Sequence, residues 1–197
     1  MGQSPAEASQ AEPAQVLFGA TRLELSSGFV RLLDLASVSV VSSRPGNYES
    51  STLGPYLAFP IPAGQVSSDA AVFSLSHRGG VDLRVADRVV ELRDLVIERR
   101  GPSAVVAARI AAQAASDGRL PLFDVVLEDS LGAEPGAAMT SPSRLTVAAA
   151  PLRLSSEAAG RLNEALGVDV FRGNMPVGTV YISAYVANVI STADSAG

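Results

Sequence analysis

The sequence predicts a mainly β fold: a two-sheet sandwich or open barrel whose open ends are covered by two short helices. Apolar and polar residues alternate with a period of two along most of the chain, as they do in strands with one buried face. Turn-forming pairs such as Gly79-Gly80 and Gly101-Pro102 separate the alternating runs. Only two segments replace this period with helical spacing.

The clearest strands are Val81–Val85 and Val89–Ile97, and Ala86–Arg88 between them predicts a hairpin turn. The stretches Ser42–Pro55 and Glu128–Ser143 are rich in Gly, Pro and small residues and predict long loops. The same alternation predicts five further strands. They span Ala70–Ser76, Ser103–Ala112, Leu120–Leu127, Arg144–Leu154 and Val177–Val189.

The two predicted helices are Ser26–Ala36 and Ser155–Leu166. Each begins with a serine, whose hydroxyl can accept a hydrogen bond from a free N–H of the first turn. Apolar residues then recur at helical spacing, which predicts one buried face. Gly167 follows the second helix and suits the left-handed residue that ends many helices.

The two helical segments resemble each other. Leu25-Ser26-Ser27 corresponds to Leu154-Ser155-Ser156, and a Pro-x-Gly-x-Val segment follows each helix, at Pro62–Val66 and Pro176–Val180. This spacing predicts an internal strand–helix–strand duplication about a pseudo-twofold axis. The alternative is a chance similarity between two Ser-capped helices.

We expect one domain over residues 16–191, because 47% hydrophobic residues can supply a sizeable core. Residues 1–15 are small and polar and predict a disordered tether of the kind that follows a cleaved signal peptide. An ordinary frayed terminus is the alternative. Residues 192–197 predict a flexible tail. These features favour an exported protein, extracellular or in the cell envelope.

Composition excludes several classes of function. There is no Cys and one His, so disulfides and a Cys- or His-rich zinc site are excluded. The net charge is −5 and the basic residues, all Arg, are scattered, which argues against nucleic-acid binding. No apolar run reaches the roughly 20 residues that span a bilayer. No serine lies in a Gly-x-Ser-x-Gly elbow, so we expect no enzymatic activity and no metal site.

Three side chains are candidates for ligand contact: His77, Tyr48 and Tyr56. His77 follows an apolar strand and precedes Gly79-Gly80, which places it at a strand end, where sites are often found. The two tyrosines lie in the predicted loop Ser42–Pro55 and at its exit. A histidine satisfied by the backbone and tyrosines that anchor a loop are the alternatives.

The order of these segments resembles the haem-transport-associated (Htaa) domain family of actinobacterial surface proteins. The matching residues are Phe59-Pro60 with Gly64, the Phe73-to-Gly79 element that contains His77, and two segments near the end of the chain. These two segments are Pro151–Ser155 and Pro176–Thr179. The resemblance implies a β-rich, secreted or wall-anchored module that binds haem, with His77 assisting the iron ligand.

The sequence departs from this family where the family carries its iron ligand. The resemblance implies a Tyr in the first helical segment, and Gly28–Leu33 contains none. We therefore expect haem, the only candidate cofactor, to bind weakly or not at all. The predicted function is non-catalytic ligand binding, with haem or a surface protein as partner. The alternative is a structural subunit of the cell envelope that self-assembles without a small ligand.

Overall fold

The structure, a computed structural model, describes residues 13–51, 54–110, 118–127, 131–134 and 143–187. Within these ranges the chain forms two helices, α1 (Ser27–Leu35) and α2 (Ser156–Leu166), and thirteen strands. The strands are β1 (Ala14–Leu25), β2 (Ser39–Ser43), β3 (Asn47–Ser51), β4 (Gly54–Ile61), β5 (Ala63–Val66), β6 (Val72–Ser76), β7 (Gly80–Val85), β8 (Arg88–Arg100), β9 (Ser103–Ile110), β10 (Leu120–Val126), β11 (Leu131–Glu134), β12 (Ser143–Leu154) and β13 (Pro176–Val186).

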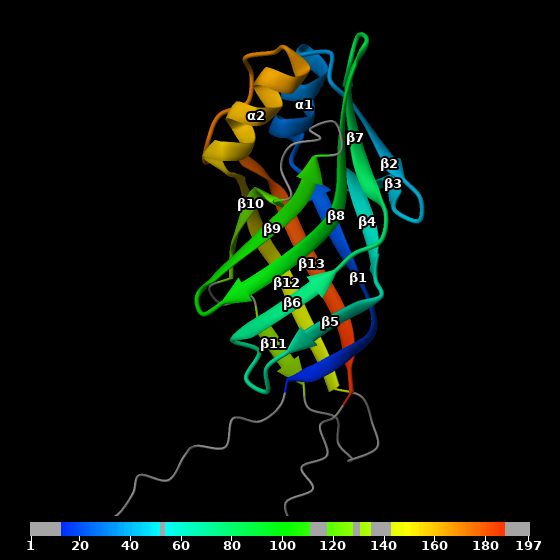
Figure 1. The fold of residues 1–197 in the computed structure, drawn as a ribbon, viewed down its shortest axis with the longest axis vertical. Coiled ribbons are helices and arrows are strands. Elements are labelled where there is room, and N and C mark those ends of the chain that lie inside the picture. The colour runs from blue at the N-terminus through cyan, green and yellow to red at the C-terminus, as the bar shows by residue number, and fades with distance from the viewer. Residues whose placement is uncertain (1–12, 52–53, 111–117, 128–130, 135–142, 188–197) are drawn as a thin grey trace, which may run out of the picture.

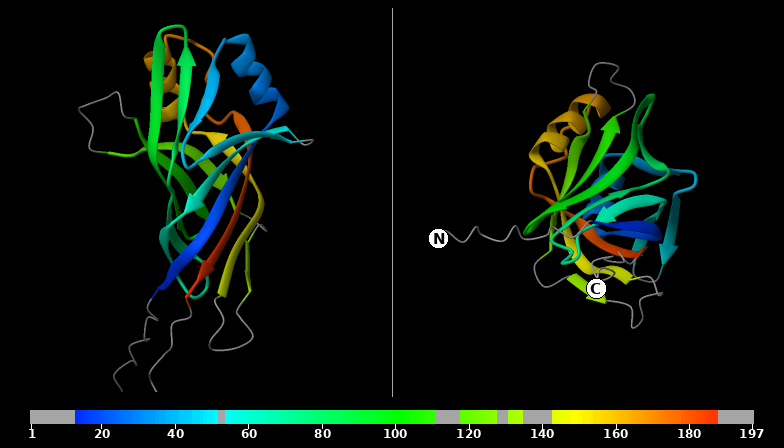
Figure 2. Two further views of the ribbon diagram at one scale, coloured as in Figure 1. Left: turned by 90° about the vertical axis from the view of Figure 1, so that its right-hand side faces the viewer. Right: turned by 60° about the horizontal axis from the view of Figure 1, so that its bottom comes forward.

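Eight of the strands close a barrel (Figures 1 and 2). β1 pairs with β13, β13 with β12 and β12 with β10. The ring continues through β9, β8, β6 and β5, and β5 returns to the start of β1. The predicted mainly β fold with two capping helices is confirmed. The strands form one closed sheet, because each of the eight strands pairs with a neighbouring strand on both sides.

The upper wall of the barrel divides into two flaps. β1 pairs with β5 at its start and with β4 from Gly19 to Glu24. β8 pairs with β6 near its end and with β7 from Arg88 to Arg93. β3 extends the flap of β4, and β2 extends that of β7. His77 lies between β6 and β7, at the level where the wall divides.

Both helices lie over the upper mouth of the barrel (Figure 1). The Ser26 hydroxyl accepts a 3.2 Å hydrogen bond from the N–H of Phe29, and the Ser155 hydroxyl accepts a 3.0 Å bond from that of Ala158. Gly167 ends α2 with φ of 68°, a conformation that costs glycine little. The predicted helices and their caps are therefore confirmed.

The predicted duplication extends over a strand and a helix only. β1 and β12 both have 12 residues and flank β13 on opposite edges, and each runs through Leu-Ser-Ser into its helix. Beyond the helices the paths differ. β2 follows α1 and pairs with β7, whereas the segment after α2 contains no strand until β13, which pairs with both β1 and β12. The prediction of a repeated second strand is wrong, because the chain returns from α2 directly to the barrel wall.

Two predicted loops contain strands, and that part of the prediction is wrong. Residues 47–51 form β3, which pairs with β4, and residues 131–134 form β11, which pairs with β12. In both places a neighbouring strand supplies the hydrogen-bond ladder, and this tertiary pairing outweighs a turn-like composition.

The barrel begins slightly before the predicted start of the domain at residue 16. β1 begins at Ala14, so the last two residues of the predicted tether belong to the barrel. The rest of the predicted tether, residues 1–12, lies outside the described residues, and so does the predicted tail at residues 192–197.

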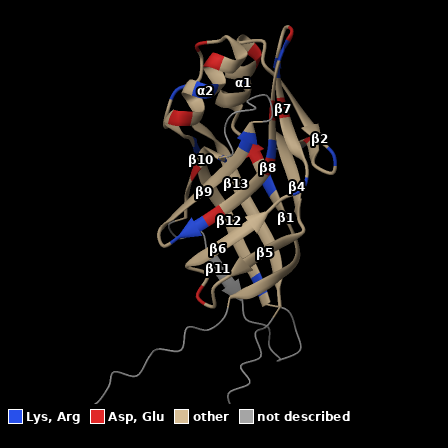
Figure 3. Ribbon diagram, in the orientation of Figure 1, with Lys and Arg blue, Asp and Glu red and all other residues tan. Residues whose placement is uncertain are grey.

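The outer surface carries acidic and basic residues that are interspersed over the helices and the upper strands (Figure 3). Neither of the described helices has the length and apolar character needed to cross a membrane.

Candidate functional site

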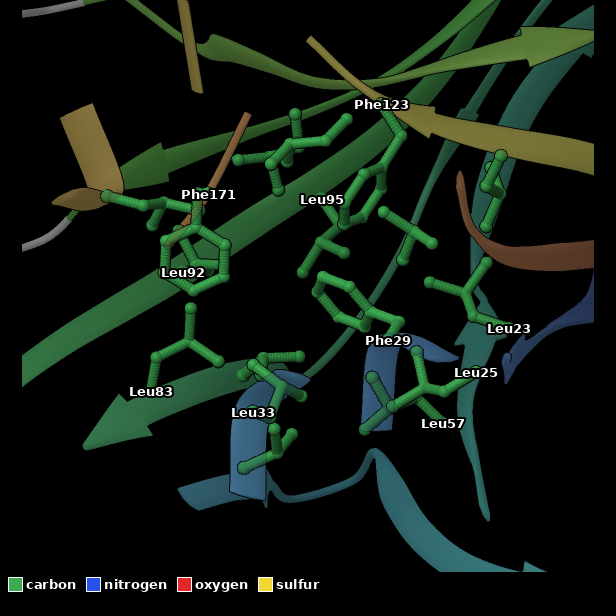
Figure 4. A pocket seen from close by; sticks show the side chains of 17 residues that line it. Leu23, Leu25, Phe29, Leu33, Leu57, Leu83, Leu92, Leu95, Phe123 and Phe171 are labelled. Atoms are coloured by element: carbon green, nitrogen blue, oxygen red, sulfur yellow. The ribbon is translucent and has the colours of Figure 1, made fainter. Parts of the chain in front are cut away.

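An apolar cavity of about 60 Å³ lies between the two helices and the upper mouth of the barrel (Figure 4). It is lined by 17 side chains, and all of them are Leu, Val or Phe. α1 contributes Phe29 and Leu33, and α2 contributes Leu162. Phe171 comes from the segment that follows α2, and the strands contribute the remaining side chains. The cavity is therefore formed at the junction of both helices and both flaps.

Helical spacing accounts for the contribution of α1. Phe29 and Leu33 are four residues apart and project from one face of the helix. Leu33 is the buried residue of this helix, whereas Leu35 is 78% exposed. The Phe29 ring contacts the Phe171 ring at 6.4 Å between centroids. This contact closes the cavity between α1 and the segment that follows α2.

Asn163 holds Phe171 in place. Its side-chain amide donates a 2.9 Å hydrogen bond to the carbonyl of Phe171, and its side-chain oxygen accepts bonds from the N–H groups of Val170 and Phe171. One side chain of α2 thus satisfies three backbone groups of a segment without regular structure. This arrangement fixes one wall of the cavity.

His77 lies inside the barrel and is 8% exposed. Its Nδ1 is 3.2 Å from the carbonyl oxygen of Leu95, and its Nε2 is 2.8 Å from the hydroxyl of Thr21. A carbonyl only accepts, so Nδ1 carries the proton of the neutral ring and Nε2 accepts from Thr21. His77 therefore joins β8 to β1 across the barrel interior.

A bulge in β8 makes the Leu95 carbonyl available. The register of β8 against β9 shifts between Arg93 and Val96, and Asp94 has a φ of 52°. The Leu95 carbonyl accepts from the backbone N–H of His77 at 2.9 Å as well as from its ring. Burial lowers the pKa of His77 from 6.5 to about 4, and the hydrogen bond to Leu95 opposes this shift. The ring is therefore neutral at neutral pH.

His77 is separated from the cavity by one layer of side chains. Leu23 and Leu95 line the cavity and also border the small space that His77 lines. His77 itself is not among the lining residues. Both of its ring nitrogens are already hydrogen-bonded, so the histidine matches the alternative of a side chain satisfied within the protein.

Tyr56 lies on β4, with its side chain on the outer face of the barrel. Its hydroxyl donates to Glu49 on β3, and the guanidinium of Arg22 lies 4.7 Å from its ring centroid. Arg22 also lies 5.6 Å from the ring of Tyr181 on β13. The hydrogen bond to Glu49 raises the pKa of Tyr56. These contacts anchor the β3–β4 flap to the barrel wall.

Tyr48 lies on β3 and is 41% exposed. Its register partner on β4 is Leu57, which lines the cavity. Opposed residues of a pair share one face of the sheet, so Tyr48 lies on the inner side of the flap, near its edge. The three predicted residues are not brought together: His77 faces the barrel interior, Tyr56 faces outward, and Tyr48 lies on the edge strand.

The sequence did not identify the residues that line the cavity. Phe29, Leu33 and Phe171 are apolar residues with ordinary spacing, and such residues are indistinguishable from core until their packing is known. Among the described residues no group of three or more His, Asp or Glu side chains could hold a metal ion. The chemistry available at this site is apolar contact.

The chain matches no known protein family pattern and no curated protein sequence. Its fold is similar to that of the C-terminal domain of HtaA from Corynebacterium glutamicum, with a TM-score of 0.61 at 12% identity over 88% of this chain and 99% of that one. The N-terminal domain of the same protein gives 0.56 at 13% identity over 88% and 99%. The fold is that of an Hta domain.

A third similar structure is a domain-swapped dimeric variant of the C-terminal HtaA domain, with a TM-score of 0.51 at 12% identity over 95% of this chain and 98% of that one. The similarity covers nearly whole domains, so the resemblance read from the scattered motifs is confirmed at the level of the fold. The segment in which that resemblance implies an iron-binding Tyr is α1. Here α1 presents Phe29 and Leu33 to the cavity.

Proposed function

We propose that this chain is a non-catalytic, ligand-binding Hta-type domain and that its ligand occupies the cavity beneath α1 and α2. The observation that carries this proposal is a cavity lined entirely by Leu, Val and Phe where both helices and both flaps meet. Pockets for small molecules are concave and mostly apolar and favour such junctions.

The energetic cost of the void supports the proposal. At roughly 24 cal/mol per Å³, a 60 Å³ cavity costs the folded protein about 1.4 kcal/mol. A ligand that fills the cavity would recover this free energy and add apolar contact.

Haem is the candidate ligand that the Htaa resemblance implies, and the cavity can be tested for its fit. Proteins hold haem iron through His, Cys, Met or Tyr. Among the described residues that line the cavity there is none of these, and His77 lies behind Leu23 and Leu95 with both nitrogens engaged. The lining does not fit an iron-coordinating site, so hemin should bind weakly and through its apolar ring.

The test is a hemin titration of the wild-type protein and of His77→Ala, followed by the Soret band and by thermal melting. We expect weak binding in both proteins, with the same spectrum. Tight binding that disappears in His77→Ala would show that the His77 side chain rotates into the binding site. Tight binding that survives the substitution would direct attention to Tyr48 and Tyr56, which would be replaced by Phe in turn.

An exported location, extracellular or in the cell envelope, forms part of this proposal. Its support is the resemblance to surface-protein domains and the fold shared with HtaA. A fusion of the complete gene to a protease-accessible tag tests it, because protease added to intact cells should remove the tag.

Self-assembly is the second candidate function, and the open strand edges favour it. In the described part of the chain β3 pairs only with β4, and β11 only with β12. Open edges can pair with another chain. Sedimentation without ligand tests this candidate, since an assembly subunit should form oligomers whose proportion rises with protein concentration.

A further inference from the structure

We infer that the cavity takes a neutral, metal-free apolar ligand, a hydrocarbon chain or ring, in place of an iron porphyrin. The inference rests on the proposed function and specifies the class of ligand. It starts from the disagreement between the Hta fold, whose family resemblance implies haem, and the side chains that line the cavity.

The lining offers neither charge nor a hydrogen-bonding side chain. All 17 residues are Leu, Val or Phe, so a charged or strongly polar group placed among them would lose its hydration without a partner. The polar pair Thr21 and His77 lies outside this lining, and the two side chains bond to each other. A ligand in this cavity therefore contacts hydrocarbon alone.

The size of the cavity limits what it holds when α1 is in place. A volume of about 60 Å³ suits a xenon atom or a short hydrocarbon group, and apolar cavities of this kind stay dry and bind such molecules. A longer chain or a ring requires the cavity to widen. The apolar lining determines the class of ligand. The length of the ligand that fits depends on how far one wall of the cavity moves.

α1 is the wall that can move. Leu33 is its one buried residue, whereas α2 buries Ala158, Ala159, Leu162 and Leu166. The contact between the rings of Phe29 and Phe171 closes the cavity at this helix. Because Asn163 holds the segment of Phe171, an outward shift of α1 opens the cavity and leaves the opposite wall intact.

The experiment compares three probes on the complete chain. These are N-phenyl-1-naphthylamine, which is neutral and fluoresces in apolar surroundings, hemin, and metal-free protoporphyrin IX. Leu33→Phe enlarges a lining side chain and so shrinks the cavity, whereas Phe29→Ala truncates a lining side chain and so enlarges the cavity. Leu35→Ala, on the exposed side of the same helix, is the matched control. Thermal melting verifies that each variant is folded.

We expect the naphthylamine to bind the wild-type protein, to bind about tenfold more weakly to Leu33→Phe and more tightly to Phe29→Ala, and to change by less than about twofold in Leu35→Ala. Hemin and protoporphyrin IX should bind equally weakly, since the iron has no ligand to contribute. The opposite responses of the two cavity variants keep the test informative if one variant is unstable.

Three different results would overturn this inference, and they are distinguishable. Hemin that binds at least about tenfold more tightly than protoporphyrin IX, with a coordination spectrum, refutes the metal-free ligand and leaves the proposed binding function intact. If neither Leu33→Phe nor Phe29→Ala changes the affinity for the naphthylamine, the ligand binds elsewhere. If none of the three probes binds, the proposed function itself fails.

Discussion

Acidification should destabilise the folded protein through His77, the only histidine of the chain. Burial holds the pKa of His77 at about 4 in the folded state, against 6.5 for an exposed histidine. Between these two pH values the unfolded chain binds a proton that the folded chain does not. The unfolded state is then favoured as pH falls, so stability rises with pH across this window.

The size of the effect follows from the two pKa values. The difference of about 2.5 pH units at 1.36 kcal/mol each, less the partial protonation of the folded state at pH 4, gives about 3 kcal/mol lost between pH 7 and pH 4. About 2 kcal/mol of this is lost by pH 5. Above about pH 7 and well below pH 4 the contribution of His77 no longer changes with pH.

The assay is urea unfolding of the wild-type protein and of His77→Gln at several pH values from 7 to 4. Carboxyl groups titrate in both proteins, so the difference between their free energies of unfolding isolates the histidine. We expect that difference to shift by about 3 kcal/mol against the wild-type protein over this range. A difference that stays constant from pH 7 to pH 5 would refute the buried, neutral ring.

The neutral-pH cost of removing the ring provides a second check. His77→Ala leaves the Thr21 hydroxyl, which is 1% exposed, without its partner and creates a void, for a loss of about 2–4 kcal/mol. Thr21→Val removes the other half of the hydrogen bond, and the two substitutions together should cost less than the sum of the two single losses. Ser74→Ala, on the exposed side of β6, is the control and should change stability by less than about 0.5 kcal/mol.

Further predictions concern the caps, the glycines and the wall of the cavity. Ser26→Ala should cost about 1 kcal/mol, and Ser155→Ala about 2, because the buried Ser155 hydroxyl also donates to a backbone carbonyl of β10. Gly178→Ala should cost about 3 kcal/mol or more, since the new Cβ would lie 1.8 Å from a backbone oxygen of β1. Gly160→Ala meets nothing within 4 Å and should stabilise α2 by about 0.5–1 kcal/mol. Asn163→Ala should cost about 1–3 kcal/mol, because it leaves three partly buried backbone groups after α2 without a partner. Urea unfolding measures all five effects, and equal losses for Gly178→Ala and Gly160→Ala would contradict the close packing of β1 on β13.

Much of the fold could be predicted from local sequence. Ser26 and Ser155 begin helices because a serine hydroxyl satisfies free N–H groups two or three residues ahead, and Gly167 ends one because it alone adopts the left-handed conformation cheaply. The alternation of Val81–Val85 and Val89–Ile97 predicts β7 and β8, although β7 is buried on both faces from Gly80 to Leu83. These are interactions between residues close together in the chain.

The surroundings of the candidate residues depended on tertiary structure. His77 could be identified as the only histidine, but its environment depends on Thr21, 56 residues away, and on a bulge at Leu95, 18 residues away. Tyr48 and Tyr56 could be identified as candidates, yet only the pairing of β3 with β4 places them on opposite faces of one flap. Side-chain direction in a strand reverses with each residue, so register decides which of them faces the interior.

The sequence by itself determined the class of fold, the positions of both helices and the exclusion of disulfides and of a Cys- or His-rich zinc site. Only the tertiary structure decided that the strands close into a barrel, that its upper wall divides into two flaps, and that Phe29, Leu33 and Phe171 surround a cavity. The physical reason is the separation along the chain of the residues that interact. Periodicity and capping are local and can be read along the chain, whereas a cavity is formed by side chains from distant segments, each of which appears in the sequence as ordinary core.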